Sequence, residues 1–140
     1  MKAYILAALI LLTVSPAVGC GENGGAEKSA ETQNAQFEQS QIYSEEDIES
    51  AIQVISDYFD KEFEGCTLTE LYYSGDSYAD EFNEFAEIYG ADEAIILMSS
   101  FEVGPSGGDG SLNPNSTYND WNWILVRSGG GKWEHVDHGY

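Results

Sequence analysis

Positive charge is what this sequence has least of. It contains 5 Lys and Arg residues against 25 Asp and Glu residues, so its formal net charge is -20 at pH 7. A surface this acidic repels the phosphates of nucleic acids and of anionic lipid headgroups. We therefore expect no DNA or RNA partner and no direct electrostatic contact with a membrane. Such acidity keeps an exported protein soluble, and it also favours cations or basic partners.

Cysteine, histidine and the common catalytic motifs are also scarce. Cys20 and Cys66 are the only cysteines, which leaves one arithmetically possible disulfide. The sequence has no G-x-S-x-G motif, no Ser/His/Asp order and no phosphate-binding glycine loop. We expect no cofactor.

One long hydrophobic run is present, at the N-terminus. Lys2 precedes an apolar stretch from Tyr4 to Val14, and the small residues Ala17 and Gly19 follow. The run is shorter than the roughly 20 residues that span a bilayer, and its layout is typical of a signal peptide. We expect residues 1–19 to be removed on export across a bacterial cytoplasmic membrane.

The motif Ala17-Val18-Gly19-Cys20 resembles the lipobox of bacterial lipoproteins, with Ala17 where the family usually has Leu. The resemblance implies that Cys20 is lipidated and becomes the first residue of a protein held at the extracytoplasmic face of the cell membrane. Cys66 would then be a free, sheltered thiol. Ordinary signal cleavage after Ala17 or Gly19 is the alternative, and it would give a secreted protein.

Residues 20–41 are rich in Gly, Glu, Gln, Ser and Ala, a composition typical of a flexible tether. Of the 18 aromatic residues in the chain, only Tyr4 and Phe37 precede residue 42. Disordered acidic tails have few aromatics. We therefore expect a single folded domain over residues 42–140.

Two helices are predicted in this domain. The first starts at a capping box, Ser44-Glu45-Glu46-Asp47, and ends at Gly65. Its apolar stripe is Ile48, Ala51, Ile52, Ile55, Tyr58, Phe59 and Phe63. The second is capped by Asp76 or Ser77, ends at Gly90, and carries Tyr78, Phe82, Phe85 and Tyr89 on one face.

Four strands complete the pattern, at residues 66–73, 93–103, 118–127 and 132–140. The stretch 93–103 is apolar enough to be buried on both faces. The order α-β-α-β-β-β predicts an α+β fold, with both helices packed on one face of a four-stranded antiparallel twisted sheet.

This order resembles the NTF2-like, cystatin-like cone fold, and it is similar to small bacterial lipoproteins with that fold. The residues that carry the likeness are 120–127 (DWNWILVR) and the ending from Lys132-Trp133 to Gly139-Tyr140. The resemblance covers residues 42–140 and implies an apolar pocket at the open end of the cone. Relatives use that pocket for isomerisation, dehydration or ligand capture, so function has to be argued from the site.

Strand alternation predicts that Trp133, His135 and Asp137 share one face of the last strand and that His138 lies on the other. A His135–Asp137 pair on one face would be a candidate general base. Histidines on opposite faces would not chelate one zinc ion.

An EF-hand-like spacing of oxygen ligands makes Asp109, Asn113 and Asp120, with Ser111, Asn115 and Thr117 between them, candidates for calcium. Pro114 stands where that loop needs Gly, so we expect no metal there. An aromatic rim of Tyr72, Trp121, Trp123, Trp133 and Tyr140, with Tyr118, would suit a small ligand, whereas cross-strand aromatic pairs would simply stabilise the sheet.

Three functions remain open. The first is a non-enzymatic binding module for a small ligand or an envelope protein. The second is a small NTF2-like enzyme with His135 or Asp137 as base, which a buried carboxylate of raised pKa would favour. The third is a structural envelope protein.

Overall fold

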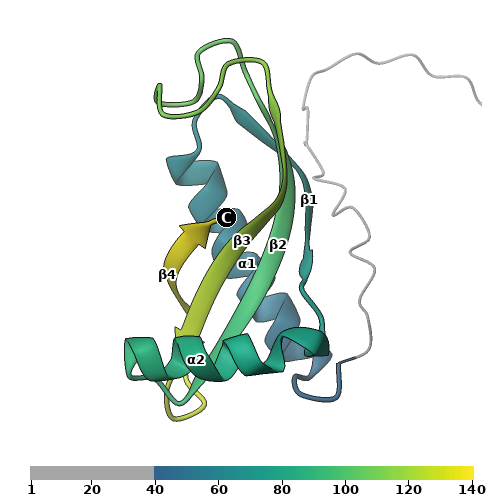
Figure 1. The fold of residues 1–140 in the computed structure, drawn as a ribbon, viewed down its shortest axis with the longest axis vertical. Coiled ribbons are helices and arrows are strands. Elements are labelled where there is room, and N and C mark those ends of the chain that lie inside the picture. The colour runs from purple at the N-terminus through teal and green to yellow at the C-terminus, as the bar shows by residue number, and fades with distance from the viewer. Residues whose placement is uncertain (1–39) are drawn as a thin grey trace, which may run out of the picture. The chain divides into compact units, whose positions relative to one another are not determined.

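The computed structural model describes residues 40–140, which form one antiparallel sheet and its helices. The elements follow in the order α1 (Glu45–Glu62), β1 (Cys66–Tyr73), η1 (Asp76–Tyr78), α2 (Ala79–Tyr89), β2 (Glu93–Val103), β3 (Thr117–Arg127) and β4 (Glu134–Gly139). The strands lie in the spatial order β1-β2-β3-β4 (Figure 1). The α+β class and the four-stranded antiparallel sheet are confirmed. The signal peptide, Cys20 and most of the tether that we predict lie outside the described residues.

Helix α1 begins at the capping box that the sequence predicts. The hydroxyl of Ser44 accepts a hydrogen bond from the backbone N–H of Asp47, and the Asp47 carboxylate accepts one from the backbone N–H of Ser44. These bonds satisfy two N–H groups that a helix start otherwise leaves free. The buried stripe is Ile48, Ala51, Ile55 and Phe59, and Ile52 is half-buried beside it.

The start of α2 differs from the prediction, because no side chain caps it. Gly75, with φ 95°, leads into the 3-10 turn η1, which continues into α2. The Asp76 carboxylate instead accepts hydrogen bonds from the Ser40 hydroxyl (2.6 Å), the Gln41 backbone N–H (2.6 Å) and the Tyr73 hydroxyl (2.8 Å). We call this group the Asp76 clasp. It fastens the beginning of the described chain to the end of β1.

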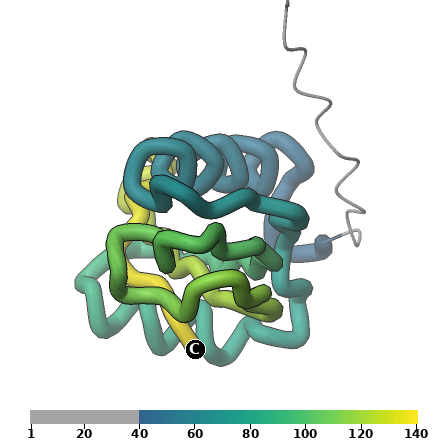
Figure 2. The backbone as a smooth tube through the Cα atoms, turned by 90° about the horizontal axis from the view of Figure 1, so that it is seen from above, coloured from purple at the N-terminus to yellow at the C-terminus, as the bar shows by residue number. Residues whose placement is uncertain are grey.

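The two helices lie on opposite faces of the sheet, so the prediction of one shared face is wrong (Figure 2). On one face Trp123 of β3 packs against Phe59 of α1, with ring centroids 6.2 Å apart. On the other face Ala94 of β2 and Val126 of β3 pack against Ala86 of α2. Strand β2 is buried on both faces, and a sheet of that kind needs a layer on each side.

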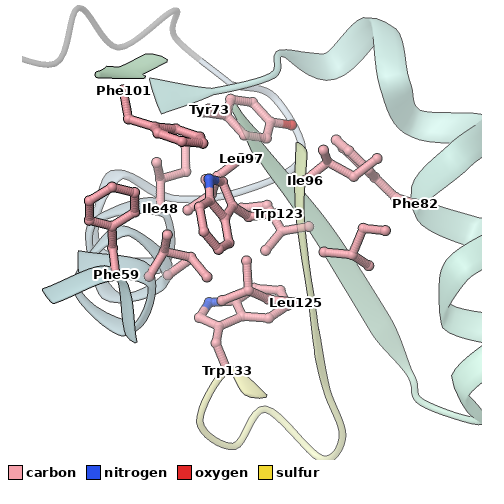
Figure 3. Packing of buried hydrophobic residues seen from close by; sticks show 14 of the residues in the cluster. Ile48, Phe59, Tyr73, Phe82, Ile96, Leu97, Phe101, Trp123, Leu125 and Trp133 are labelled. Carbon is pink, nitrogen blue, oxygen red and sulfur yellow. The ribbon is translucent and has the colours of Figure 1, made fainter. Parts of the chain in front are cut away.

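The larger core lies mainly between α1 and the sheet. Figure 3 shows Ile48 and Phe59 gathered around Trp123, with Phe82 of α2 on the far side of the strands. Trp123 is fully buried, and its indole N–H donates a hydrogen bond to the hydroxyl of Ser99, also fully buried, at 2.8 Å. The hydrogen bond between these two buried groups offsets the cost of removing them from water.

Candidate functional site

The layer between α1 and the sheet has two unlike ends. At the end where α1 begins, Arg127 pairs with Asp47 and with Glu93, and its guanidinium lies 4.2 Å from the centre of the Trp133 ring. The Trp133 indole N–H donates to the backbone carbonyl of Asp47 at 3.0 Å. The hydrogen bond from Arg127 holds the pKa of Asp47 below its usual value. We call this the closed end, because its charged and aromatic groups are tied to one another.

At the other end, where α1 stops, a cleft of about 260 Å³ opens between α1, the start of β1 and the loop of residues 104–116. We call it the aromatic cleft. Its lining residues are Tyr58, Glu62, Phe63, Cys66, Gly108, Asp109, Ser111, Leu112, Trp121 and His138. Two carboxylates belong to this set, and Glu62 pairs with Lys61 at 2.5 Å just outside it. Asp109 has no cationic partner among residues 40–140, so the cleft is aromatic and carries one uncompensated acid.

Glycines hold the cleft loop close to β1. The backbone N–H of Gly104 donates to the carbonyl of Gly65 at 2.9 Å, and a Cβ on Gly104 would lie 2.7 Å from that oxygen. Gly107 has φ +74°, and its Cβ would lie 2.7 Å from the carbonyl oxygen of Leu112. Larger residues at either position would push the loop outward and widen or collapse the cleft.

The two histidines share one face of β4, which corrects the prediction that they lie on opposite faces. The register pairs His138 with Trp123 and His135 with Leu125, and an irregularity between these pairs leaves Val136 without a partner. This bulge shifts the alternation by one residue. His138 Nδ1 and His135 Nε2 are therefore 3.3 Å apart.

The same bulge separates His135 from the carboxylate of Asp137. That carboxylate accepts hydrogen bonds from the Tyr89 hydroxyl (3.2 Å) and from the His138 backbone N–H (2.8 Å). His135 Nε2 lies 3.0 Å from the backbone carbonyl of Asp137 instead. The histidine–carboxylate pair predicted as a candidate base is not formed.

Burial sets the protonation of both imidazoles. Burial lowers the pKa of His135, and the neighbouring His138 lowers it further. Burial also lowers the pKa of His138, partly offset by the negative charge of Asp137. Tyr58 packs on His135 with ring centroids 4.3 Å apart. Both histidines are therefore neutral at pH 7, and each has one ring nitrogen that carries no proton.

The predicted aromatic rim is divided by the structure. Trp123 is in the core, and Trp133 is at the closed end. The Tyr72 hydroxyl donates to Asp120 at 3.0 Å. Trp121 lines the aromatic cleft, and Tyr140, which is 79% exposed, lies 5.2 Å from it between ring centroids.

Two aromatic residues that line the aromatic cleft were not among the residues predicted to form the aromatic rim. Tyr58 and Phe63 stood in the apolar stripe of the first predicted helix, which indicated only core. Their positions could have indicated the cleft, because Tyr58 lies near the C-terminal end of α1 and Phe63 directly follows it.

The calcium candidates do not converge on one point. The Asp109 carboxylate accepts the backbone N–H of Ser111 at 2.9 Å, and the Asn113 side-chain amide donates to the Tyr118 hydroxyl at 3.1 Å. Asp120 accepts from Tyr72. Each of the three side chains therefore has a separate local partner within the loop or the sheet.

The thiol of Cys66 lies in the wall of the aromatic cleft and is half-buried. Burial raises its pKa, and the charge of Asp109 raises it further. A thiol whose pKa is raised is largely protonated at neutral pH and is a poor nucleophile. Cys66 is thus a wall residue of the cleft.

A second groove, of about 340 Å³, lies on the α2 face of the sheet. Phe85, Ile96 and Ile124 contribute its apolar residues, while Glu81 and Asp137 are the acids in its wall. Ile96 and Ile124 are less than 10% exposed and belong to the hydrophobic core. His138 and the exposed Tyr140 also line this groove, so its floor is core and its rim is open.

Comparison of the chain with protein-family models, with curated proteins and with solved structures finds no match. Among residues 40–140, no helix is long and apolar enough to cross a membrane.

Proposed function

We propose that this chain is an exported, lipid-anchored binding module that takes a small organic cation in the aromatic cleft. The observation that carries the proposal is the lining of that cleft, to which Tyr58, Phe63 and Trp121 contribute aromatic side chains. Its acidic residues are Asp109 and Glu62, of which Glu62 also pairs with the exposed Lys61. Aromatic ring faces attract cations, and nearby carboxylates add to that attraction. The net charge of -20 raises the local concentration of cations around the domain.

Binding is preferred to catalysis because no acid–base pair accompanies the cleft. His138 lines it, but the Asp137 carboxylate bonds to Tyr89 and to a backbone N–H. A general base needs a group that orients it as well as a group that reacts. The cleft offers ring faces and charge, which are enough for recognition.

The direct test is a calorimetric titration of the full chain with choline and with its uncharged isostere, in which carbon replaces nitrogen. We expect choline to bind and the isostere to bind more weakly. Trp121→Leu should weaken choline binding by about 2- to 30-fold, because it removes one ring face. Tyr72→Leu, an aromatic substitution outside the cleft, should leave it unchanged. Equal binding of both compounds, or binding of neither, would contradict the proposal.

The lipid anchor is tested by detergent-phase partitioning of the expressed protein. The native chain should enter the detergent phase, and Cys20→Ser should move to the aqueous phase or remain unprocessed. Cys66→Ser is the matched control and should partition like the native chain. A water-soluble native protein with a Cys20–Cys66 disulfide would overturn the anchor and the free thiol together.

We also propose kinship with NTF2-like domains, for residues 42–140. Its support is the order of helices and strands and the pairing of β3 with β4, the segments in which the sequence likeness lies. The placement of α2 on the face opposite α1 is a departure from the predicted arrangement.

A further inference from the structure

The histidine pair at the open end has a geometry of its own. His135 Nε2 and His138 Nδ1 face each other at 3.3 Å, from one short edge strand. The bulge at Val136 is what brings them together, since a regular strand would place residues three apart on opposite faces.

This separation matches the spacing of two ligands of one metal ion. A tetrahedral Zn²⁺ binds imidazole nitrogens at about 2.0–2.1 Å, so two such nitrogens lie about 3.3–3.4 Å apart. The distance of 3.3 Å between His135 Nε2 and His138 Nδ1 falls in that interval. A metal ion that binds both nitrogens therefore requires no change in the distance between them.

Aromatic packing holds both rings in place. His135 lies 4.3 Å from the Tyr58 ring and 5.6 Å from the Trp123 ring, and His138 lies 5.1 Å from Trp123, all measured between ring centroids. Trp123 is itself fixed by its hydrogen bond to Ser99. Rings that are already oriented lose little entropy when they bind a metal.

We propose that His135 Nε2 and His138 Nδ1 form a two-histidine site for a divalent transition metal ion such as Zn²⁺ or Cu²⁺. No three His, Cys, Asp or Glu side chains converge within residues 40–140, so water or the carbonyl oxygen of Asp137 completes the coordination. Imidazole ligands select such ions over Ca²⁺ and Mg²⁺, which prefer oxygen.

Metal binding fixes the tautomers of both rings. With the metal on Nε2 of His135 and Nδ1 of His138, the proton of each neutral ring is on its other nitrogen, so only the ring whose proton lay between the two nitrogens changes tautomer. Without metal, a single proton between the two nitrogens makes the hydrogen bond of the pair. The inference does not rest on the proposed cation ligand, because it requires neither Glu62 nor the ring of Trp121.

The first test is a calorimetric titration of the untagged full chain with Zn²⁺. One ion should bind per chain, and excess Ca²⁺ should not compete. His135→Ala and His138→Ala should each weaken binding more than about 100-fold, because even outer-sphere partners of a ligand contribute about 10- to 100-fold. Glu49→Gln, which removes an exposed carboxylate of α1 and no proposed ligand, is the control and should bind as the native chain does.

The second test uses the native chain alone, so it does not depend on how the variants fold. Long-range nitrogen–proton NMR correlations of the imidazoles should show Zn²⁺ on Nε2 of His135 and on Nδ1 of His138. Coordination through the other nitrogens would overturn the proposal. So would the absence of saturable binding, displacement of Zn²⁺ by Ca²⁺, or full binding by the double His135→Ala, His138→Ala variant. The last result would mean that the acidic surface alone collects the ion.

Discussion

The closed end and the open end of the α1 layer contain the same kinds of residue and use them differently. At the closed end, the indole N–H of Trp133 donates to Asp47, and Arg127 lies over the ring. At the open end, the indole N–H of Trp121 is buried without an acceptor among the described residues, and its ring lines the aromatic cleft. The difference separates aromatics that hold the fold from those free to meet a ligand.

The largest effect is expected in the core that both ends share. Phe59 is 2% exposed and packs against Phe63, Phe101 and Trp123. Phe59→Ala should lower the free energy of unfolding by about 3–5 kcal/mol, because it removes buried surface and leaves a cavity. A denaturant titration measures the change. A loss below about 1 kcal/mol would contradict the packing of α1 on the sheet.

A matched pair of tryptophan variants tests the comparison directly. Trp133→Phe should cost about 1–3 kcal/mol more in unfolding free energy than Trp121→Phe, because only the Trp133 N–H has a partner to lose. Both variants shrink an indole to a phenyl ring, so their difference reports the hydrogen bond together with the contact of Arg127 with the Trp133 ring. Equal costs in the same denaturant titration would show that the two ends are not distinct in this respect.

The hydroxyl of Tyr43 provides a further test of how hydrogen bonds stabilise the closed end. Its hydroxyl donates to the carbonyl of Ala94 at 2.6 Å, and burial raises its pKa from 10.0 to about 12. Tyr43→Phe should cost about 1–1.5 kcal/mol at pH 7. Since the folded pKa exceeds the unfolded one, this contribution is full below pH 10 and is lost as the pH rises towards 12.

Thermal melts of the native chain and of Tyr43→Phe, taken across that alkaline range, measure the difference. The gap in melting temperature should narrow as the pH rises. A gap that stays constant would mean that the hydroxyl does not titrate with folding.

The smallest effect is expected from Asp47→Asn, about 0.5–1 kcal/mol, because solvent screens a carboxylate whose side chain is 30% exposed. The pKa of Asp47 is lower in the folded chain than its usual 3.8. Its contribution is therefore full above that value and is lost as the pH falls through the lower folded pKa. Melts in acid should show native and variant converging, and a difference that persists in strong acid would contradict the ion pair.

Local signals predicted most of the secondary structure. The capping box at Ser44 and the left-handed Gly90 act within one turn of a helix, so the sequence around them is enough to predict both. The face that α2 covers was predicted wrongly, because it depends on how β2 is buried in three dimensions. The apolar run of 93–103 indicated the correct arrangement, since a strand that is buried on both faces needs a layer of structure on each side.

The candidate site was harder to predict, and one residue explains why. The bulge at Val136 reverses the facing of every β4 residue beyond it relative to a regular strand. It joins the two histidines and removes Asp137 from His135. Neither propensity nor alternation marks a bulge at Val136, so the sequence alone predicted the wrong partner for His135 and the wrong face for His138.

The Asp76 clasp determines which part of the domain is reached first by a force on the preceding chain. It grips Ser40 and Gln41 beside the start of α1, whereas the aromatic cleft lies at the far end of a helix of 18 residues, roughly 27 Å away. A pull along the proposed tether therefore reaches Asp76 and β1 first, and it does not pass through the cleft loop.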